Sequence, residues 1–181
     1  MKKIFLVMLL SVVVAGCSLF EKKEVIPVTA PTPLTATAKL QNSSGEDVGD
    51  VKFTQTETGV ELTANFENLP EGTHAIHIHD VGKCEAPTFE TAGAHFNPQH
   101  KEHGIENPKG PHAGDLPNLE IGEDGTLEVR FVSKEFTLEK GKDNSLFDED
   151  GSSIVIHEGA DDYKTDPSGN SGARIACGVI E

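Results

Sequence analysis

The stretch of sequence that decides the fold is His74-Ala75-Ile76-His77-Ile78-His79, residues 74–79. Successive side chains of a β-strand point to opposite faces, so both imidazoles of the His77-x-His79 pair share one face of the expected strand. That face can present two nitrogens to one ion. His74 lies an odd number of residues from His77 and points to the opposite face, so we interpret it as a structural hydrogen-bonding residue and not as a ligand.

Further donors follow this pair along the chain and complete a candidate two-metal site: His95, His103, His112, Asp115 and His157. Imidazole and carboxylate donors without a thiolate fit tetrahedral zinc or tetragonal copper, whereas calcium and magnesium prefer oxygen ligands. Two four-coordinate ions need more donor positions than these side chains supply, so one side chain serves twice or a water completes a site. The alternative is that these are scattered surface histidines.

Most of the chain has a β pattern. Apolar residues alternate in three stretches, each predicting a strand with one buried face: Ala36, Ala38 and Leu40; Val60, Leu62, Ala64 and Phe66; Leu127, Val129 and Phe131. Residues 57–59 (Glu-Thr-Gly) and 123–125 (Glu-Asp-Gly) are turn candidates, and no long segment has helical periodicity. We therefore expect an all-β fold, an antiparallel sandwich or barrel.

Two segments interrupt the strand pattern and are expected to be long loops. Residues 81–118 are rich in Gly, Pro, His and Lys, and residues 158–173 are rich in Asp, Gly, Ser and Pro. Loops of this length often carry function. His100 lies in a polar part of the first segment, and we expect it to be solvated.

The N-terminal segment is expected to be a targeting signal. Lys2 and Lys3 precede an apolar run that is too short to span a bilayer, and Val-Ala-Gly-Cys at 14–17 has the pattern of a bacterial lipobox. We predict a lipoprotein signal peptide at 1–16, lipidation of Cys17, a flexible tether at 17–34 and a folded domain at 35–181. The alternative is an ordinary signal peptide with a spare cysteine.

The motifs together resemble the copper/zinc superoxide dismutase family, of the kind found outside the bacterial cytoplasm. The resemblance extends from about residue 35 to the C-terminus and lies in these segments: 74–79 (HAIHIH), 93–98 (GAHFNP), 103–104 (HG), 112–116 (HAGDL), 155–158 (VIHE), 161–162 (DD) and 172–180 (GARIACGVI). It implies a Greek-key β-sandwich or barrel with two long functional loops.

The resemblance also implies the site. Copper is expected on His77, His79, His95 and His157, and zinc on His95, His103, His112 and Asp115, with His95 as the bridge between the metals. Asp161 corresponds to the carboxylate that orients one copper and one zinc histidine. Arg174 corresponds to the arginine that attracts the anionic substrate, and Ser168 keeps a hydroxyl at the channel wall.

The implied activity is dismutation of superoxide to dioxygen and hydrogen peroxide. Copper is the redox centre, His95 supplies a proton, and zinc holds His95 and tunes its basicity. The implied location is the cell membrane, with the lipid-anchored domain outside the cytoplasm, protecting the cell exterior. Two alternatives are a lipoprotein that buffers copper or zinc without turnover, and an adhesion-type sandwich with a vestigial site.

The cysteine count predicts one disulfide. If Cys17 bears the lipid, Cys84 and Cys177 remain as an even pair in an oxidising compartment. We expect them to be bonded to each other, the alternative being two free buried thiols.

The net charge is the feature that fits the substrate least well. The chain has a formal net charge of -15, and an anion is repelled by such a surface unless a local field overrides it. Arg174, the metals and Lys164 are the candidates for attraction. The acidity excludes nucleic acid as a partner, and the sequence leaves a homodimer open.

Overall fold

The computed structural model describes residues 32–181. The expected signal peptide at 1–16, the lipidated Cys17 and the tether up to residue 31 lie outside the described residues. Within these described residues, regular structure begins with a strand at Thr35.

Strands dominate the described part of the chain. Their bounds are β1 Thr35–Asn42, β2 Asp47–Thr56, β3 Gly59–Phe66, β4 Gly72–His74, β5 Ile76–His79, β6 Leu119–Ile121, β7 Leu127–Ser133, β8 Ser153–His157 and β9 Arg174–Val179. A single 3-10 turn, η1, spans Glu90–Ala92, and residues 32–181 contain no α-helix. None of these residues belongs to a helix with the length and apolar character of a membrane span. The prediction of an all-β fold is confirmed.

The apolar residues that alternate in the sequence are the ones whose side chains face the core. In β1 the side chains of Ala36, Ala38 and Leu40 are buried while their neighbours are exposed. β3 follows the same pattern, and Leu127, Val129 and Phe131 of β7 pack partly buried against the core. Both turn candidates separate strands, because residues 57–58 join β2 to β3 and residues 122–126 join β6 to β7.

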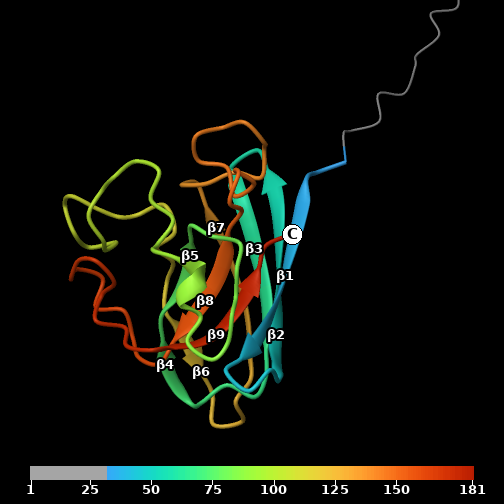
Figure 1. The fold of residues 1–181 in the computed structure, drawn as a ribbon, viewed down its shortest axis with the longest axis vertical. Helices are drawn as coiled ribbons and strands as arrows, with labels where there is room; N and C mark the ends of the chain where they lie inside the picture. The colour runs from blue at the N-terminus through green and yellow to red at the C-terminus, as the bar shows by residue number, and fades with distance from the viewer. Residues whose placement is uncertain (1–31) are drawn as a thin grey trace, which may run out of the picture. The chain divides into compact units, whose positions relative to one another are not determined.

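The sheet is antiparallel, with strand order β5-β8-β9-β1-β2-β3-β7, and a small second sheet pairs β4 with β6. β1, β2 and β3 are consecutive neighbours, whereas the chain crosses from β7, at one edge of the sheet, to β8, which lies beside β5 at the other edge. Figure 1 shows that the large sheet curls. The core is formed by its apolar side chains, among them Leu40, Phe53 and Ile78.

Both predicted loops are present, one between β5 and β6 and the other between β8 and β9. They appear in Figure 1 as the green-to-yellow and red loops beside β5, β8 and β4. A third long segment, residues 134–152, connects β7 to β8 without strand or helix.

Candidate metal centre

β5 is buried on both faces, and this places its two histidines. Ile76 and Ile78 belong to the hydrophobic core, so the alternating His77 and His79 side chains lie on the opposite face. Their side chains are also buried, with 0% and 1% of their surface exposed. A strand that is polar on the face away from the core becomes fully buried only when another layer covers that face.

The loop between β5 and β6 provides that layer by bonding to the free edge of β5. The Ile78 N–H donates to the Gly114 carbonyl at 2.9 Å, and the Phe96 N–H donates to the Ile78 carbonyl at 2.9 Å. Single bridges then set His79 opposite His95 and His77 opposite Asp115. A side chain at Gly114 would collide with the Ile78 carbonyl, so this approach requires glycine.

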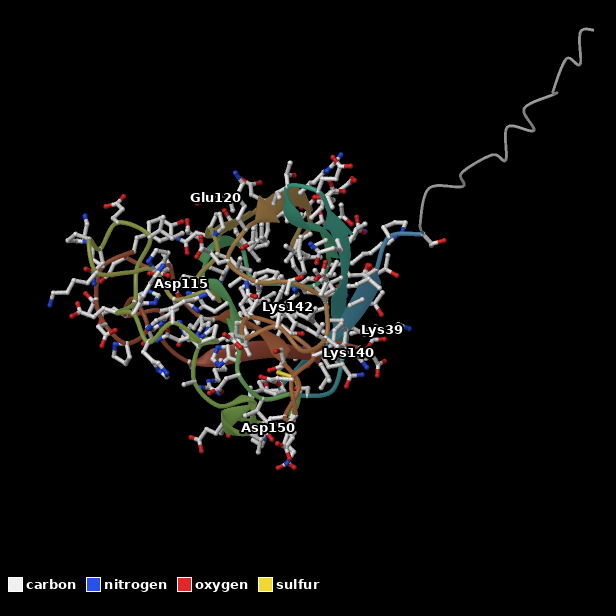
Figure 2. The ribbon with its side chains drawn as sticks, turned by 90° about the horizontal axis from the view of Figure 1, so that it is seen from above. Lys39, Asp115, Glu120, Lys140, Lys142 and Asp150 are labelled. Atoms are coloured by element: carbon white, nitrogen blue, oxygen red, sulfur yellow. A yellow bond between two sulfur atoms is a disulfide. The ribbon has the colours of Figure 1, made fainter. Side chains whose placement is uncertain are left out.

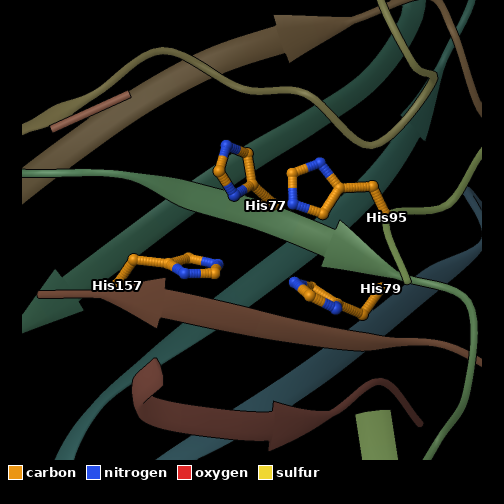
Figure 3. Close-up of side chains that lie close together, drawn as sticks. All are labelled: His77, His79, His95 and His157. Atoms are coloured by element: carbon orange, nitrogen blue, oxygen red, sulfur yellow. The ribbon is translucent and has the colours of Figure 1, made fainter. Parts of the chain in front are cut away.

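Four histidines converge into a first cluster, shown in Figure 3: His77, His79, His95 and His157. One ring nitrogen of each lies within 4.8 Å of the corresponding nitrogens of the others. The outer nitrogens are hydrogen-bonded. The Nδ1 of His79 lies 3.0 Å from the Gly93 carbonyl, and the Nδ1 of His157 lies 3.4 Å from the Gly172 carbonyl.

These outer hydrogen bonds determine which nitrogen carries the proton. Carbonyl and carboxylate oxygens accept, so the nitrogen that faces them is protonated and the other nitrogen keeps a free lone pair. The free nitrogens are His77 Nδ1, His79 Nε2, His95 Nε2 and His157 Nε2, and all four are buried without a hydrogen-bond partner. The first cluster therefore presents four unprotonated imidazole nitrogens, which is the form that binds a metal ion.

A second cluster surrounds one oxygen of Asp115. Its Oδ1 lies 3.0 Å from Nδ1 of His95, 3.0 Å from Nδ1 of His103 and 3.4 Å from Nδ1 of His112. The other oxygen, Oδ2, accepts hydrogen bonds from the backbone N–H groups of Gly104 and His112, each at 2.9 Å. His95 thus belongs to both clusters, with Nε2 toward the first and Nδ1 toward the second.

The two clusters touch at His77 as well. A four-residue group within 4.8 Å contains His77 together with His95, His103 and Asp115, in place of His112. However, Nε2 of His77 is bonded to Asp161, and its Nδ1 is one of the four unpartnered nitrogens of the first cluster. His112 Nδ1 lies 3.5 Å from His95 Nδ1, so the structure brings His112 close to His95, His103 and Asp115 as well.

Asp161 is hydrogen-bonded to one histidine of each cluster. Its Oδ2 accepts a hydrogen bond from His77 Nε2, and its Oδ1 accepts one from His103 Nε2, both at 2.9 Å. Asn118 fixes the Asp161 backbone from both sides, with its Oδ1 on the N–H and its Nδ2 on the carbonyl. One carboxylate therefore orients a histidine of each cluster.

Arg174 lies at the start of β9, beside the first cluster. Its Nη1 donates to the Phe89 carbonyl at 2.7 Å and its Nη2 to the Gly93 carbonyl at 2.6 Å. The loop that provides these carbonyls is fastened to β9 by the predicted disulfide between Cys84 and Cys177, the yellow bond in Figure 2. The Gly93 carbonyl thus holds both Arg174 and the His79 ring.

Comparison with known proteins shows the family of this chain. The family model described as copper/zinc superoxide dismutase (SODC) matches residues 48–180. The chain belongs to the copper/zinc superoxide dismutase family. The match confirms the family, the enzyme class and the copper and zinc cofactors that the sequence motifs predicted.

Relatives in this family are similar over most of the chain. The chain is 49% identical to superoxide dismutase [Cu-Zn] 1 of Aquifex aeolicus, covering 80% of this chain and 86% of that protein. It is 42% identical to the superoxide dismutase-like protein YojM of Bacillus subtilis, covering 98% of this chain and 94% of that protein. A crystal structure of a SOD-like protein from Bacillus subtilis superposes with a TM-score of 0.78 at 45% identity, covering 80% and 97% of the two chains.

Burial and carboxylates move the histidine pKa values of this dismutase centre in opposite directions. Burial lowers the pKa of His95 to about 4 and that of His157 to about 3, and it also lowers the pKa of His77 and His79. Burial acts against the charge of His103 too, but its hydrogen bonds to Asp115 and Asp161 raise its pKa to about 9. The pKa of the histidine between two carboxylates is therefore raised, whereas the pKa values of the four histidines of the first cluster are lowered.

Three further residues considered in the sequence lie outside the two clusters. His74 is buried, with Nδ1 2.9 Å from the His157 carbonyl and Nε2 3.0 Å from the Pro70 carbonyl, which confirms it as a structural hydrogen-bonding residue. His100 is exposed, as expected. Lys164 forms an ion pair with Glu106 at 2.8 Å, so its charge is already partnered and it is a weaker source of anion attraction than the sequence suggested.

The groups that hold the ligand side chains in position could not be recognised from the sequence. The Gly93, Phe89 and Gly172 carbonyls are backbone atoms, and no residue type signals them. Asn118 sits at the end of the first loop, and nothing in its local sequence connects it to Asp161, 43 residues away.

Proposed function

We propose that this chain dismutates superoxide to dioxygen and hydrogen peroxide at a copper ion joined to a zinc ion through His95. The convergence of four buried, unpartnered imidazole nitrogens in the first cluster supports this most. Leaving one buried polar group unsatisfied costs about 1–3 kcal/mol. Four such atoms directed at one another fit a bound cation and no arrangement of protein donors.

The two donor sets suit different metals. The first cluster, His77, His79, His95 and His157, is all imidazole, which suits copper. The second combines three imidazole nitrogens with one carboxylate oxygen, the donor set of a closed zinc site. We therefore assign copper to the first cluster and zinc to His95, His103, His112 and Asp115.

Copper, when bound, would supply the one-electron redox chemistry of the reaction. The overall reaction converts two superoxide anions and two protons into one dioxygen and one hydrogen peroxide. We assign the delivery of one proton to Nε2 of His95, which takes up a proton from solvent in each cycle, passes it to the substrate and is then unprotonated again. Nδ1 of the same ring is fixed on the Asp115 side. The second proton comes from solvent.

Arg174 supplies the local attraction that an acidic enzyme requires. The guanidinium remains charged at every physiological pH, and its two carbonyl partners fix its direction. Burial lowers its pKa. The fixed charge draws superoxide toward the first cluster against the repulsion of the net charge of -15.

We further propose that the domain is anchored by a lipid on Cys17 and acts outside the cytoplasm. The lipobox pattern at 14–17 supports this, and so does the disulfide, because disulfides persist in oxidising compartments. Replacement of Cys17 by serine should release the protein from the membrane fraction. Retention of the C17S protein on membranes would contradict the anchor.

The deciding experiment compares metal loadings of one preparation. The chain is freed of metal, reloaded with zinc alone or with copper plus zinc, and its superoxide dismutation rate is measured. Activity in the copper-loaded form alone supports the proposal. Stoichiometric binding of both metals without activity would favour a metal-buffering lipoprotein instead.

A ligand variant tests the assignment of copper. His157→Ala should abolish dismutation while zinc remains bound, because His157 belongs to the first cluster alone. Full activity at full zinc occupancy would refute the copper assignment.

A further inference from the structure

A cavity of about 540 Å³ opens beside the second cluster, and three long loops line it. Asp143 and Asp148 come from the 134–152 segment, and Asp166 comes from the loop between β8 and β9. His95 and His112 line it from the loop between β5 and β6. The cavity therefore connects the unassigned third segment with two of the proposed zinc ligands.

The charge of the cavity lining is strongly negative. Four aspartates, Asp80, Asp143, Asp148 and Asp166, face it together with a single lysine, Lys101. The Lys101 ammonium lies 3.8 Å from the Glu135 carboxylate, which offsets its charge. The Oδ1 atom of Asp80 is buried without a hydrogen-bond partner.

The carboxylates lead from the surface to the histidines. Asp143 and Asp148 are exposed, and neither side chain has a hydrogen-bond or ion-pair partner among the described residues. Asp166 is half exposed, and its Oδ1 lies 3.9 Å from Nε2 of His112. The opposite nitrogen of that ring, Nδ1, lies 3.4 Å from Asp115 Oδ1 inside the second cluster. A cation passing these carboxylates in turn would arrive at the His112 ring.

We propose that this cavity is the route by which a hydrated divalent cation reaches the second cluster. The inference rests on the proposed function only in taking that cluster as the zinc site. A cleft lined by one sign of charge raises the local concentration of the opposite ion and can raise its association rate by roughly 10- to 1000-fold. Arg174 does not line the cavity, so the loading cation and the superoxide anion approach the centre separately.

The test measures how fast the metal-free full chain takes up Co²⁺, a probe whose visible absorption reports tetrahedral binding. The cavity variant is the pair Asp143→Asn and Asp148→Asn, since these exposed side chains hold no partner and do not touch the ligands. The matched control, Asp50→Asn with Glu128→Gln, removes the same net charge from exposed positions on β2 and β7. Rates are taken by stopped flow at low and at high salt.

We expect the cavity pair to slow Co²⁺ uptake roughly 10-fold at low salt, with the difference vanishing at high salt. The control pair should stay within about twofold of the unaltered chain, because its charges lie outside the cavity. Equal slowing by both pairs would overturn the proposal in favour of net charge alone. Absence of a tetrahedral Co²⁺ spectrum in the unaltered chain would overturn it as well. Inactivity of the copper-loaded protein would count only against the proposed function, because uptake is read without turnover.

Discussion

Nε2 of His77 and Oδ2 of Asp161 lie 2.9 Å apart, 84 residues from each other in the chain, with both side chains fully buried. The same carboxylate bonds His103 at 2.9 Å. One side chain on the second loop therefore sets the ring orientation of a proposed copper ligand and a proposed zinc ligand together.

Asp161→Asn should weaken zinc binding by about 10- to 100-fold, the usual cost of losing the group that orients a metal-bound histidine. An amide cannot accept from both rings as a carboxylate does. Competition with a zinc chelator measures the affinity, and Glu128→Gln on exposed β7 is the control. Unchanged zinc affinity in the D161N protein would show that zinc binding does not depend on the hydrogen bonds from Asp161 to the histidine rings.

Arg174→Ala should lower kcat/KM by roughly 10-fold at low salt and flatten its dependence on ionic strength, because the fixed charge that attracts the anion is gone. Arg174→Lys keeps a charge but cannot hold the Phe89 and Gly93 carbonyls at once, so its rate should fall in between. Arg130→Ala removes an exposed arginine that pairs with Glu61 on the neighbouring strand. If R130A and R174A altered the salt profile alike, the position of Arg174 would have no special role.

The metal-free protein should be most stable near pH 6.5. The lowered pKa values of His95, about 4, and of His157, about 3, favour folding above their ordinary 6.5. That contribution is lost as the pH falls from 6.5 through 4 and 3, because the unfolded chain binds the protons more readily. His103, raised to about 9, acts in the opposite sense, and its contribution is lost as the pH rises from 6.5 through 9.

Urea midpoints measured from pH 4 to 10, without and with zinc, test this profile. Zinc on Nδ1 of His103 would replace the proton there, so the alkaline decline should disappear in the zinc-loaded protein. A decline of equal size in both forms would point to another titrating group.

Replacing Cys84 and Cys177 together by alanine should lower the free energy of unfolding by roughly 4 to 5 kcal/mol, the chain-entropy value for so long a loop. The two half-cystines are 93 residues apart in sequence. The same variant should lower kcat/KM, since the released loop carries the carbonyls that fix Arg174. Chemical denaturation of the zinc-loaded protein gives the first quantity and steady-state kinetics the second. A destabilised protein with unaltered kcat/KM would show that the disulfide is not needed to orient Arg174.

Local patterns were sufficient for much of the centre. The alternation in residues 74–79 places Ile76 and Ile78 in the core and both histidines opposite them, because side-chain direction in a strand has a period of two residues. His112 and Asp115 lie in one loop, where the Asp115 carboxylate accepts a hydrogen bond from the His112 N–H at 2.9 Å. Donor chemistry then indicated zinc or copper, and the family resemblance implied both.

Only the folded chain decided how these donors are held and reached. The carbonyl of Gly93, the amide of Asn118 and the aspartates of residues 134–152 come from distant segments, and their contacts depend on how the loops pack over β5. Backbone carbonyls belong to every residue, and exposed acids are common, so neither leaves a local signal. The sequence alone determined the strand faces and the chemical types of the candidate donors, because both depend on neighbouring residues and side-chain chemistry. The tertiary structure decided the proton positions on the rings and the acidic cavity, because these require groups far apart in the chain to meet.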